Sequence, residues 1–293
     1  MNDLPECIDK DSYAYLFADD TKVFRNISGP DDITKLQKDI ECLVQWSNTW
    51  MLKFHPNKCV SMSMGSKTFN TYSMEDHNLD ISNCEKDLGV QIDDKLNFER
   101  HITAAVNKAN KIMAVVRKTF EYLDEQTFCY IFKGLVRPHL EYGAPIWNPH
   151  KIKLKELIEN VQRRATKQVP GLSSLSYEER LKVLKLPTLA YRRTRGDMIQ
   201  VYKILSNGYD NSLPSILTQS NTGLRGHKKK LFIKGGNKNI RQFYFTLRVG
   251  KIWNSLPQHV VLAKDVKAFE GELDKFWQDQ DLVYDFKAEI KCK

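Results

Sequence analysis

The pattern of apolar and polar residues changes from strand-like to helical at about Phe98. Before that residue, short apolar and aromatic runs alternate with polar turns, as is typical of short strands. After it, apolar residues recur every three or four positions, which is the spacing of an amphipathic helix. The sequence therefore predicts an α+β fold, with a small mixed unit followed by a mainly helical region.

The first predicted element is a β-hairpin. Tyr13–Phe17 and Thr21–Phe24 are β-prone apolar runs on either side of the short acidic turn "ADD". A helix should follow, capped by Asp31 or Asp32, and Pro56 should prevent it from continuing. Further short strands are expected over Lys58–Gly65, Thr68–Met74 and Glu85–Asp93.

The remaining two thirds of the chain should be mainly helical. Helical spacing of apolar residues extends over residues 98–116, 124–136, 152–169, 177–184, 188–205, 240–253 and 266–277. Pro138, Gly143, Pro145 and Pro149 predict an irregular connection between two of these helices. The Gly- and Lys-rich residues 219–239 predict a long loop or hairpin.

Charge is distributed unevenly between the two parts. The chain of 293 residues has a net charge of +9, from 45 Lys and Arg against 36 Asp and Glu. Residues 1–100 hold 11 basic and 18 acidic residues, a net of −7, which leaves 34 and 18, a net of +16, for residues 101–293. The acidic N-terminal part suits the binding of metal ions, and the basic C-terminal part suits the binding of a polyanion. A solvated basic surface without a partner is the alternative.

The cysteines and the apolar runs restrict the class of protein. Six cysteines are scattered without the CxxC spacing of a zinc site, which favours a reducing compartment. The polar N-terminal stretch "MNDLPECIDK" lacks the features of a signal peptide. No apolar run approaches the roughly 20 residues that span a bilayer. We therefore expect a nuclear or cytoplasmic protein without a membrane partner.

Asp19 and Asp20 form the candidate metal site. Mg²⁺ prefers oxygen ligands, and two carboxylates in a tight turn between buried strands would be rigid ligands at the edge of a sheet. The pair alone is ambiguous, because two other Asp-Asp pairs occur in the chain and most such pairs form turns or helix caps. The aromatic runs on both sides favour the functional interpretation.

The segment "YLFADDTKVF" resembles the third palm motif of reverse transcriptases, which in non-LTR retrotransposons reads Tyr or Phe, then ADD, then Thr. The later segments "LQKDIECLVQWSNTWMLKFHPNKCVSMSMG" and "KDLGVQIDDKLNFERHI" resemble the next parts of that family, up to the start of the thumb. "LVRPHLEYGAPIWNP", "IENVQRRATKQVPGL" and "FTLRVGKIWNSLP" resemble the C-terminal region of jockey-like elements. Nearly the whole chain is thus similar, in order, to the C-terminal portion of such an enzyme.

The resemblance implies a partial palm over residues 1–97, a helical thumb over residues 98–169 and a basic helical region over residues 170–293. It also implies an RNA-directed DNA polymerase and assigns roles to residues that match the family's motifs. Asp19 would be a Mg²⁺ ligand and Asp20 its partner. Lys58 would act as general acid towards pyrophosphate, or is an exposed lysine. Leu88 and Gly89 would form the primer-grip turn, or Gly89 is an ordinary strand glycine.

The basic helices would hold the duplex of RNA template and DNA primer through phosphate contacts, without reading bases. Some of these arginines could instead pair with Glu156, Glu159, Glu178 or Glu179. The tryptophans are expected in the core. The basic residues lie in three groups: Arg163, Arg164 and Lys167; Arg192, Arg193 and Arg195; His227, Lys228, Lys229 and Lys230.

The family's earlier palm aspartate and its fingers do not precede Tyr13. We therefore expect no polymerase activity from the chain by itself, since the metal site would lack an essential carboxylate. Two other hypotheses stay open. The chain could be a nucleic-acid-binding module without catalysis. It could also be a helical partner-binding protein, including one that docks with a separately encoded upstream fingers–palm segment.

Overall fold

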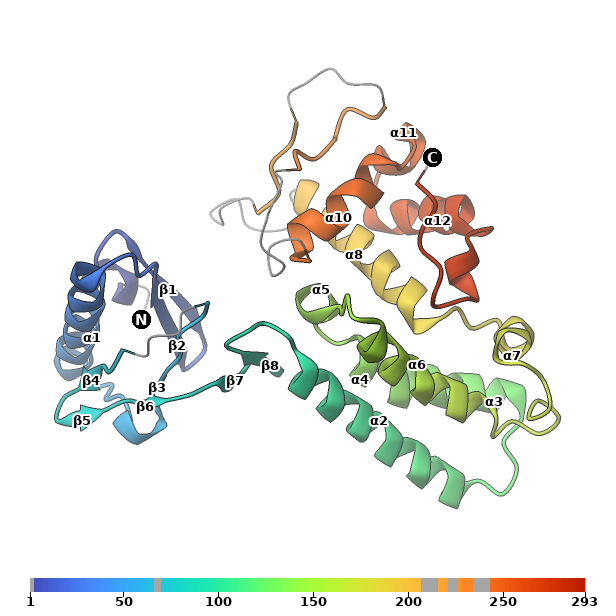
Figure 1. The fold of residues 1–293 in the computed structure, drawn as a ribbon, viewed down its shortest axis with the longest axis horizontal. Coiled ribbons are helices and arrows are strands. Elements are labelled where there is room, and N and C mark those ends of the chain that lie inside the picture. Colours follow the sequence, from blue (N-terminus) through green and yellow to red (C-terminus); the bar gives the residue numbers. More distant parts are fainter. Residues whose placement is uncertain (1–2, 66–69, 207–215, 221–225, 234–242, 293) are drawn as a thin grey trace. The chain divides into compact units, whose positions relative to one another are not determined.

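The computed structural model describes residues 3–65, 70–206, 216–220, 226–233 and 243–292. The chain divides into two compact units, residues 1–95 and residues 96–293. The first contains short strands and one long helix, and the second is helical (Figure 1). This arrangement confirms the predicted α+β class. None of the described helices is long and apolar enough to cross a membrane.

The first unit opens with the predicted hairpin. Strands β1 (Ser12–Phe17) and β2 (Asp20–Arg25) pair in antiparallel register, with Phe17 opposite Asp20. A two-residue turn joins them, and Ala18 within it has a φ of 52°. Positive φ at the first turn residue matches the right-handed twist of the strands, which is why such turns connect hairpins.

The predicted single strand over Glu85–Asp93 is wrong, because this segment is a second hairpin. Strands β7 (Cys84–Asp87) and β8 (Val90–Asp93) are antiparallel and are joined by Leu88 and Gly89. Both turn residues have positive φ, 44° and 85°, as a type I′ turn requires. A glycine adopts this conformation readily, whereas a leucine does so at a cost of about 1–2 kcal/mol.

Helix α1 (Pro30–Thr49) differs from the prediction at both ends. Its N-cap is Gly29, and the side chain of Asp32 instead accepts a hydrogen bond from the backbone N–H of Ser28 at 2.9 Å. The helix ends seven residues before Pro56, and Met51 just beyond it has a φ of 56°. One face of the helix packs on a small core with these buried members: Ile40, Tyr72, Met74 and Leu79.

The other strands of this unit are only two residues long, which the sequence prediction of longer strands did not anticipate. Residues 68 and 69 of one predicted strand lie outside the described residues. Strand β3 (Val60–Ser61) is parallel to β6 (Asp80–Ile81), and β4 (Ser73–Met74) is antiparallel to β5 (His77–Asn78). Two 3-10 turns complete the unit, η1 (Leu4–Cys7) and η2 (Pro56–Lys58).

The second unit contains helices close to those predicted. Its elements are α2 (Glu99–Thr119), α3 (Glu125–Ile131), the π-helical turn η3 (Phe132–Val136), α4 (Arg137–Glu141), α5 (Ala144–Trp147), α6 (Ile152–Thr166), α7 (Tyr177–Leu184), α8 (Leu189–Leu205), α10 (Phe245–Asn254), α11 (Gln258–Val261), α12 (Val266–Trp277) and η4 (Asp281–Val283). Residues 234–242, which include part of the predicted loop and the predicted start of α10, lie outside the described residues.

The predicted irregular connection from Pro138 holds only in part, because two short helices lie within it and only residues 142–143 and 148–151 are irregular. Pro138 lies in the first turn of α4 and Pro145 in the first turn of α5. In α5 the proline removes an N–H that has no partner inside the helix, and its fixed φ suits the helical start. Pro138 instead lies where the π-helical turn η3 runs directly into α4, so the helical run continues through this proline.

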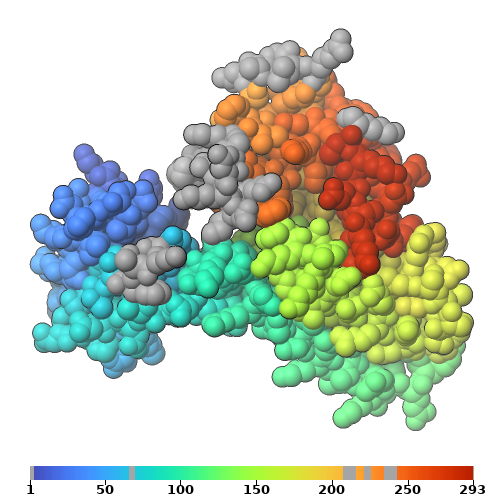
Figure 2. Space-filling view, in the orientation of Figure 1, coloured from blue at the N-terminus to red at the C-terminus, as the bar shows by residue number. Residues whose placement is uncertain are grey.

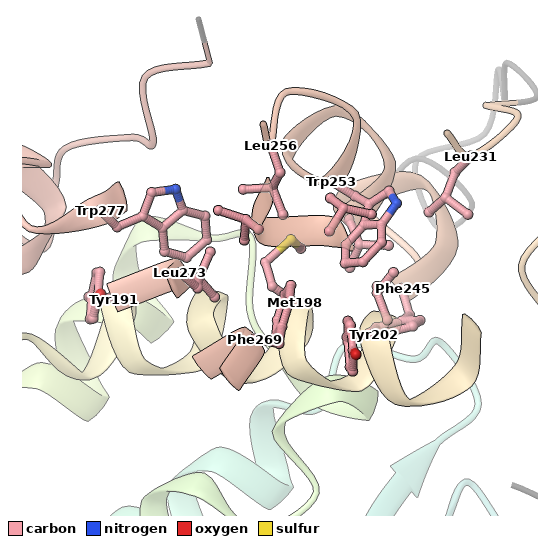
Figure 3. Close-up of a cluster of buried hydrophobic side chains, with 14 of the residues drawn as sticks. Tyr191, Met198, Tyr202, Leu231, Phe245, Trp253, Leu256, Phe269, Leu273 and Trp277 are labelled. Carbon is pink, nitrogen blue, oxygen red and sulfur yellow. The ribbon is translucent and has the colours of Figure 1, made fainter. Parts of the chain in front are cut away.

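One hydrophobic core of the second unit lies between α8, α10 and α12. Figure 3 shows Met198 and Tyr202 of α8 facing aromatic side chains of α10 and α12. The ring of Tyr202 stacks on the ring of Phe269, with centroids 4.4 Å apart. The centroid of the Trp253 ring lies 5.9 Å from that of Phe269. Trp147, Trp253 and Trp277 are buried as predicted, but Trp50 in the first unit is 57% exposed.

A buried carboxylate connects α6 to the start of α8. Glu159 accepts hydrogen bonds from the hydroxyl of Tyr177 at 2.6 Å and from the backbone N–H groups of Leu189 and Ala190 at 3.1 and 3.3 Å. Burial raises the pKa of Glu159 above its ordinary value. The carboxylate satisfies donors at the N-terminus of α8 that have no partner within the helix.

Candidate functional site

Asp19 and Asp20 lie at the tip of the first hairpin, and both are exposed. Asp19 belongs to the two-residue turn, and Asp20 begins β2 directly opposite Phe17. The tip thus presents two adjacent carboxylates to solvent. This is the position that the sequence predicted for a pair of metal ligands.

The strands that carry this tip are not buried, contrary to the prediction. Tyr13, Tyr15 and Phe17 alternate onto one face of β1, and Phe24 joins them from β2. These four side chains are 44–60% exposed, and the first two rings stack on Phe24 at 5.2 and 5.4 Å. The sheet has only these two strands, and the exposure of the four rings shows that their face is left uncovered by the described part of the chain.

The base of the hairpin is held by Arg25, whose side chain is only 3% exposed. Its guanidinium lies 2.9 Å from Asp9, 3.3 Å from Asp32 and 3.6 Å from Asp11. The pKa of Asp9 is lowered by the backbone N–H of Asp11 and then by Arg25. The pKa of Asp32 is lowered by the backbone N–H of Ser28 and then by Arg25.

A second acid fixes the hairpin to α1. Asp39 is buried and accepts hydrogen bonds from the hydroxyl of Ser12 at 2.5 Å and from the backbone N–H of Asp9 at 2.7 Å. Ser12 also accepts a hydrogen bond from Arg25 at 3.0 Å. The hairpin therefore has a restrained base and an exposed acidic tip.

The second hairpin is connected to the first by an ion pair. The ammonium of Lys22 on β2 lies 2.5 and 2.6 Å from the two carboxylate oxygens of Asp87 on β7. Asp87 directly precedes the turn of Leu88 and Gly89, so this ion pair links that turn to the hairpin that carries Asp19 and Asp20. Sequence reasoning missed this pair, because 65 residues separate its members and neither belongs to a periodic pattern.

Lys58 lies at the end of η2 and is exposed. Among the described residues, its side chain takes part in none of the hydrogen bonds that hold the two hairpins. The structure thus brings together the acidic tip and the turn at Gly89, but it does not link Lys58 to either.

The described residues include no group of three or more His, Cys, Asp and Glu side chains that could hold a metal ion. Asp19 and Asp20 offer the oxygen ligands that Mg²⁺ prefers, but a two-metal site requires further carboxylates. The residues present therefore do not complete such a site by themselves.

The predicted basic group on α8 is occupied by internal contacts. Arg192 forms a bidentate ion pair with Glu141, and Arg195 lies 2.5 Å from Asp274. Arg193 is 2% exposed, so the prediction that it contacts phosphate does not fit its position. The alternative of pairing with acids holds for Arg192 and Arg195, although their partners are Glu141 and Asp274 and none of the four glutamates that the sequence suggested.

On α6 the three predicted residues differ in accessibility. The guanidinium of Arg163 lies between the rings of Tyr177 and Phe286, 5.2 Å from each centroid. Arg164 and Lys167 are exposed, which leaves them accessible to a partner. Arg163 therefore contributes mainly to packing, through cation–π contacts on two sides.

The third predicted group lies just before Leu231, which forms an isolated antiparallel β-bridge with Gln219. His227 is 3% exposed, and its Nε2 lies 3.0 Å from the carbonyl oxygen of Trp253. The prediction of a phosphate contact does not fit this buried ring, whose pKa is lowered by burial. Lys228 is exposed, and Lys229 and Lys230 are partly exposed.

Two curated proteins are similar to this chain. An uncharacterized protein of Caenorhabditis elegans is 27% identical over 132 residues, which cover 44% of this chain and 67% of that protein. The RNA-directed DNA polymerase from mobile element jockey of Drosophila melanogaster is 25% identical over 195 residues, which cover 62% of this chain.

The alignment spans 21% of the length of the jockey polymerase. No family model matches the chain, and no solved structure is significantly similar to it. The similarity to the jockey polymerase supports a retroelement-derived region related to reverse transcriptases within this chain.

Proposed function

We propose that this chain is a portion of an RNA-directed DNA polymerase of a jockey-like non-LTR retrotransposon. The observation that carries the proposal is the acidic tip of Asp19 and Asp20 on a hairpin with a fixed base, in a chain similar to the jockey polymerase. The hairpin would supply one side of a metal site, and the helical unit would bind the nucleic acid.

In this proposal Asp19 is a metal ligand and Asp20 its partner. Mg²⁺, when bound, would neutralise charge that develops on the transferred phosphoryl group. The protein's own contribution is positional. Arg25 and Asp39 restrain the base of the hairpin, so the two carboxylates are held in place before any ligand binds.

The proposal includes inactivity of the chain by itself. Two adjacent carboxylates without a third would hold metal poorly, and losing this electrostatic stabilisation is expected to lower the rate by many orders of magnitude. The missing carboxylate would come from another segment of polypeptide. The uncovered aromatic face around Phe24 is where we place such a fingers–palm segment.

The primer and the template are assigned to further residues. The turn of Leu88 and Gly89 would contact the primer strand, since a glycine in a tight turn allows close approach of a backbone. Lys58 would serve as the general acid towards pyrophosphate. The RNA template and DNA primer duplex would lie against exposed basic residues of the helical unit.

The test is a primer-extension assay with Mg²⁺, an RNA template and a DNA primer. We expect no extension by the chain alone. We expect extension when the chain is mixed with the fingers–palm segment of a jockey-like polymerase, and loss of that extension with Asp19→Asn. Asp76→Asn is the matched control, because Asp76 is also exposed but lies outside the hairpin. Extension by the chain alone would contradict the proposed inactivity.

A second candidate function is nucleic-acid binding without catalysis. The net charge of +16 in residues 101–293 favours it, because this excess of cations is independent of the acidic hairpin. A gel-shift assay with an RNA–DNA hybrid would support it if binding is strong and salt-dependent while the mixed extension assay gives no product.

A further inference from the structure

Arg193 on α8 is a buried cation with an unsatisfied hydrogen-bond donor. The residue is 2% exposed, and its Nε donates to the side-chain oxygen of Asn148 at 3.1 Å. Its Nη1 is buried and has no hydrogen-bond partner within the part of the chain that the structure describes. A buried charged donor without an acceptor is costly and rare in native proteins, and a bound water or ion is one way to satisfy it.

Lys155 on α6 lies beside Arg193. The two helices are connected through Glu159, which accepts a hydrogen bond from the backbone N–H of Leu189 at 3.1 Å. Lys155 lies four residues before Glu159, and Arg193 lies four residues after Leu189, so each cation is on the same helix face as this contact. Beyond Lys155, towards the start of α6, Asn148 bonds Arg193. The two cations therefore face each other between two hydrogen-bonded contacts.

The ammonium of Lys155 also lacks a partner. Its side chain is partly exposed and forms no ion pair or hydrogen bond with any of the described residues. Burial and then the charge of Arg193 lower the pKa of Lys155, and only the charge of Glu289 acts in the opposite direction. Two cations that are both short of acceptors thus lie next to each other and repel.

The acids around Arg193 do not balance the two cations. Two of these acids form ion pairs with other arginines: Asp197 with Arg248, and Glu141 with Arg192. Burial raises the pKa of the third acid, Glu159, so its charged form is disfavoured. Arg193 and Lys155 therefore leave an excess of positive charge between α6 and α8.

We propose that a small inorganic anion of the size of chloride binds between Nη1 of Arg193 and the ammonium of Lys155. The anion would accept charge-assisted hydrogen bonds from both groups and would remove their repulsion. A water would satisfy the buried donor but would leave the charge uncompensated, which favours an anion. Arg193 is too buried to meet a phosphate of a duplex, so this site is separate from the duplex contact of the proposed function.

The anion would enter from the side of Lys155. Figure 2 shows yellow-green atoms of α6 at the surface of the helical unit, beside the dark red C-terminal segment. Lys287 of that segment lies 3.7 Å from Glu156, the residue after Lys155. Because part of the Lys155 side chain remains exposed, a small ion can reach its ammonium from solvent.

The test is chlorine-35 NMR of chloride in the presence of the full chain. Chloride that exchanges with a protein site gives a broadened resonance, and the added width should saturate as chloride is titrated. Lys155→Met removes the charge and the donor from a side chain of similar length. We expect the dissociation constant to rise by about tenfold or more in this variant, as is typical for the loss of one charge-assisted hydrogen bond. Arg193→Lys, which lacks Nη1, should weaken binding as well.

The matched control is Lys153→Met on the same helix, because Lys153 is 86% exposed and lies away from Arg193. This control should bind chloride as the wild type does. Replacing chloride by gluconate at constant ionic strength should lower the melting temperature of the wild type and of the control, but not that of Lys155→Met. Equal broadening in the wild type and in Lys155→Met would overturn the proposal. Broadening that does not saturate would overturn it too, since a water would then satisfy Arg193.

Discussion

Lys22 donates to both carboxylate oxygens of Asp87, at 2.5 and 2.6 Å, and so joins the acidic hairpin to the hairpin of the Leu88–Gly89 turn. The two side chains are 42% and 25% exposed, so solvent screens the pair. The contact therefore contributes more to the relative position of the two turns than to overall stability.

A double-mutant cycle on this pair should give a small coupling energy. We expect Lys22→Ala and Asp87→Ala to be coupled by about 0.2–1 kcal/mol, as for other partly exposed pairs, and less at high salt. Chemical denaturation measures the coupling. Amide hydrogen exchange at Gly89 should become faster in both single variants, whereas Lys38→Ala, another exposed lysine of this unit, should leave it unchanged. Unchanged exchange in all variants would show that the pair does not hold the turn.

Leu88→Asn should stabilise the first unit by about 1 kcal/mol, since asparagine tolerates the positive φ that leucine adopts here at a cost. Thermal or urea denaturation measures the change. Leu52→Asn is the control, because Leu52 is similarly exposed but is not among the residues with positive φ. A loss of stability with Leu88→Asn would mean that the leucine side chain makes contacts worth more than the strain.

The sequence predicted those features that depend on local pattern. The aromatic runs around "ADD" predicted the first hairpin, and apolar spacing predicted α7 and α12 with their observed bounds. Exposure was not predictable in the same way. The strands that hold Tyr13 and Phe24 read as buried because they are aromatic, yet burial depends on which other strand lies beside them.

Local sequence pattern likewise did not predict which charged residues are free to bind a partner. Runs of arginine drew attention to α8, but distant acids at positions 141 and 274 neutralise those arginines. On α2 the basic residues are spaced further apart, but no acid lies among them in residues 100–120, and Arg100 and Lys111 are exposed. Pairing across more than fifty residues decides which charges are available, and no local pattern encodes it.

Arg25→Gln should lower the stability of the first unit most at neutral pH. Arg25 helps to keep the pKa of Asp9 and of Asp32 below the ordinary value. A lowered pKa stabilises the fold above the unfolded pKa, near 4, and this contribution is lost as pH falls through the folded pKa. The difference between wild type and variant should therefore shrink below about pH 4. Urea denaturation at several pH values measures it, and a difference that grows on acidification would contradict the assignment.

Glu159→Ala should destabilise the helical unit by about 3 kcal/mol or more, because three buried donors lose their acceptor at roughly 1 kcal/mol each. Denaturation followed by the fluorescence of the buried tryptophans measures the loss. Glu156→Ala on the same helix is the control. Glu156 forms only a partly exposed ion pair with Lys287 at 3.7 Å, so its removal should cost less than about 1 kcal/mol.

Glu159 should also make the stability of the helical unit depend on pH. Its raised pKa means that its contribution is fully present below the unfolded pKa, near 4, and is lost as pH rises through the folded pKa. Glu159→Gln removes the titrating group. Relative to this variant, the wild type should lose stability as pH rises above about 4. Parallel stability curves for the two proteins would contradict the raised pKa.

Substitution should hardly change stability at Asp19 but should lower it at Asp39, since Asp19 is exposed at the hairpin tip and Asp39 is buried at its base. Asp19→Asn should change stability by no more than about 0.5 kcal/mol. Asp39→Ala should cost about 2 kcal/mol, because Ser12 and the N–H of Asp9 lose their acceptor. Urea denaturation of both variants measures these changes. A carboxylate kept at an exposed tip without a structural role is what a ligand position requires, and a large loss of stability with Asp19→Asn would argue that the tip is structural.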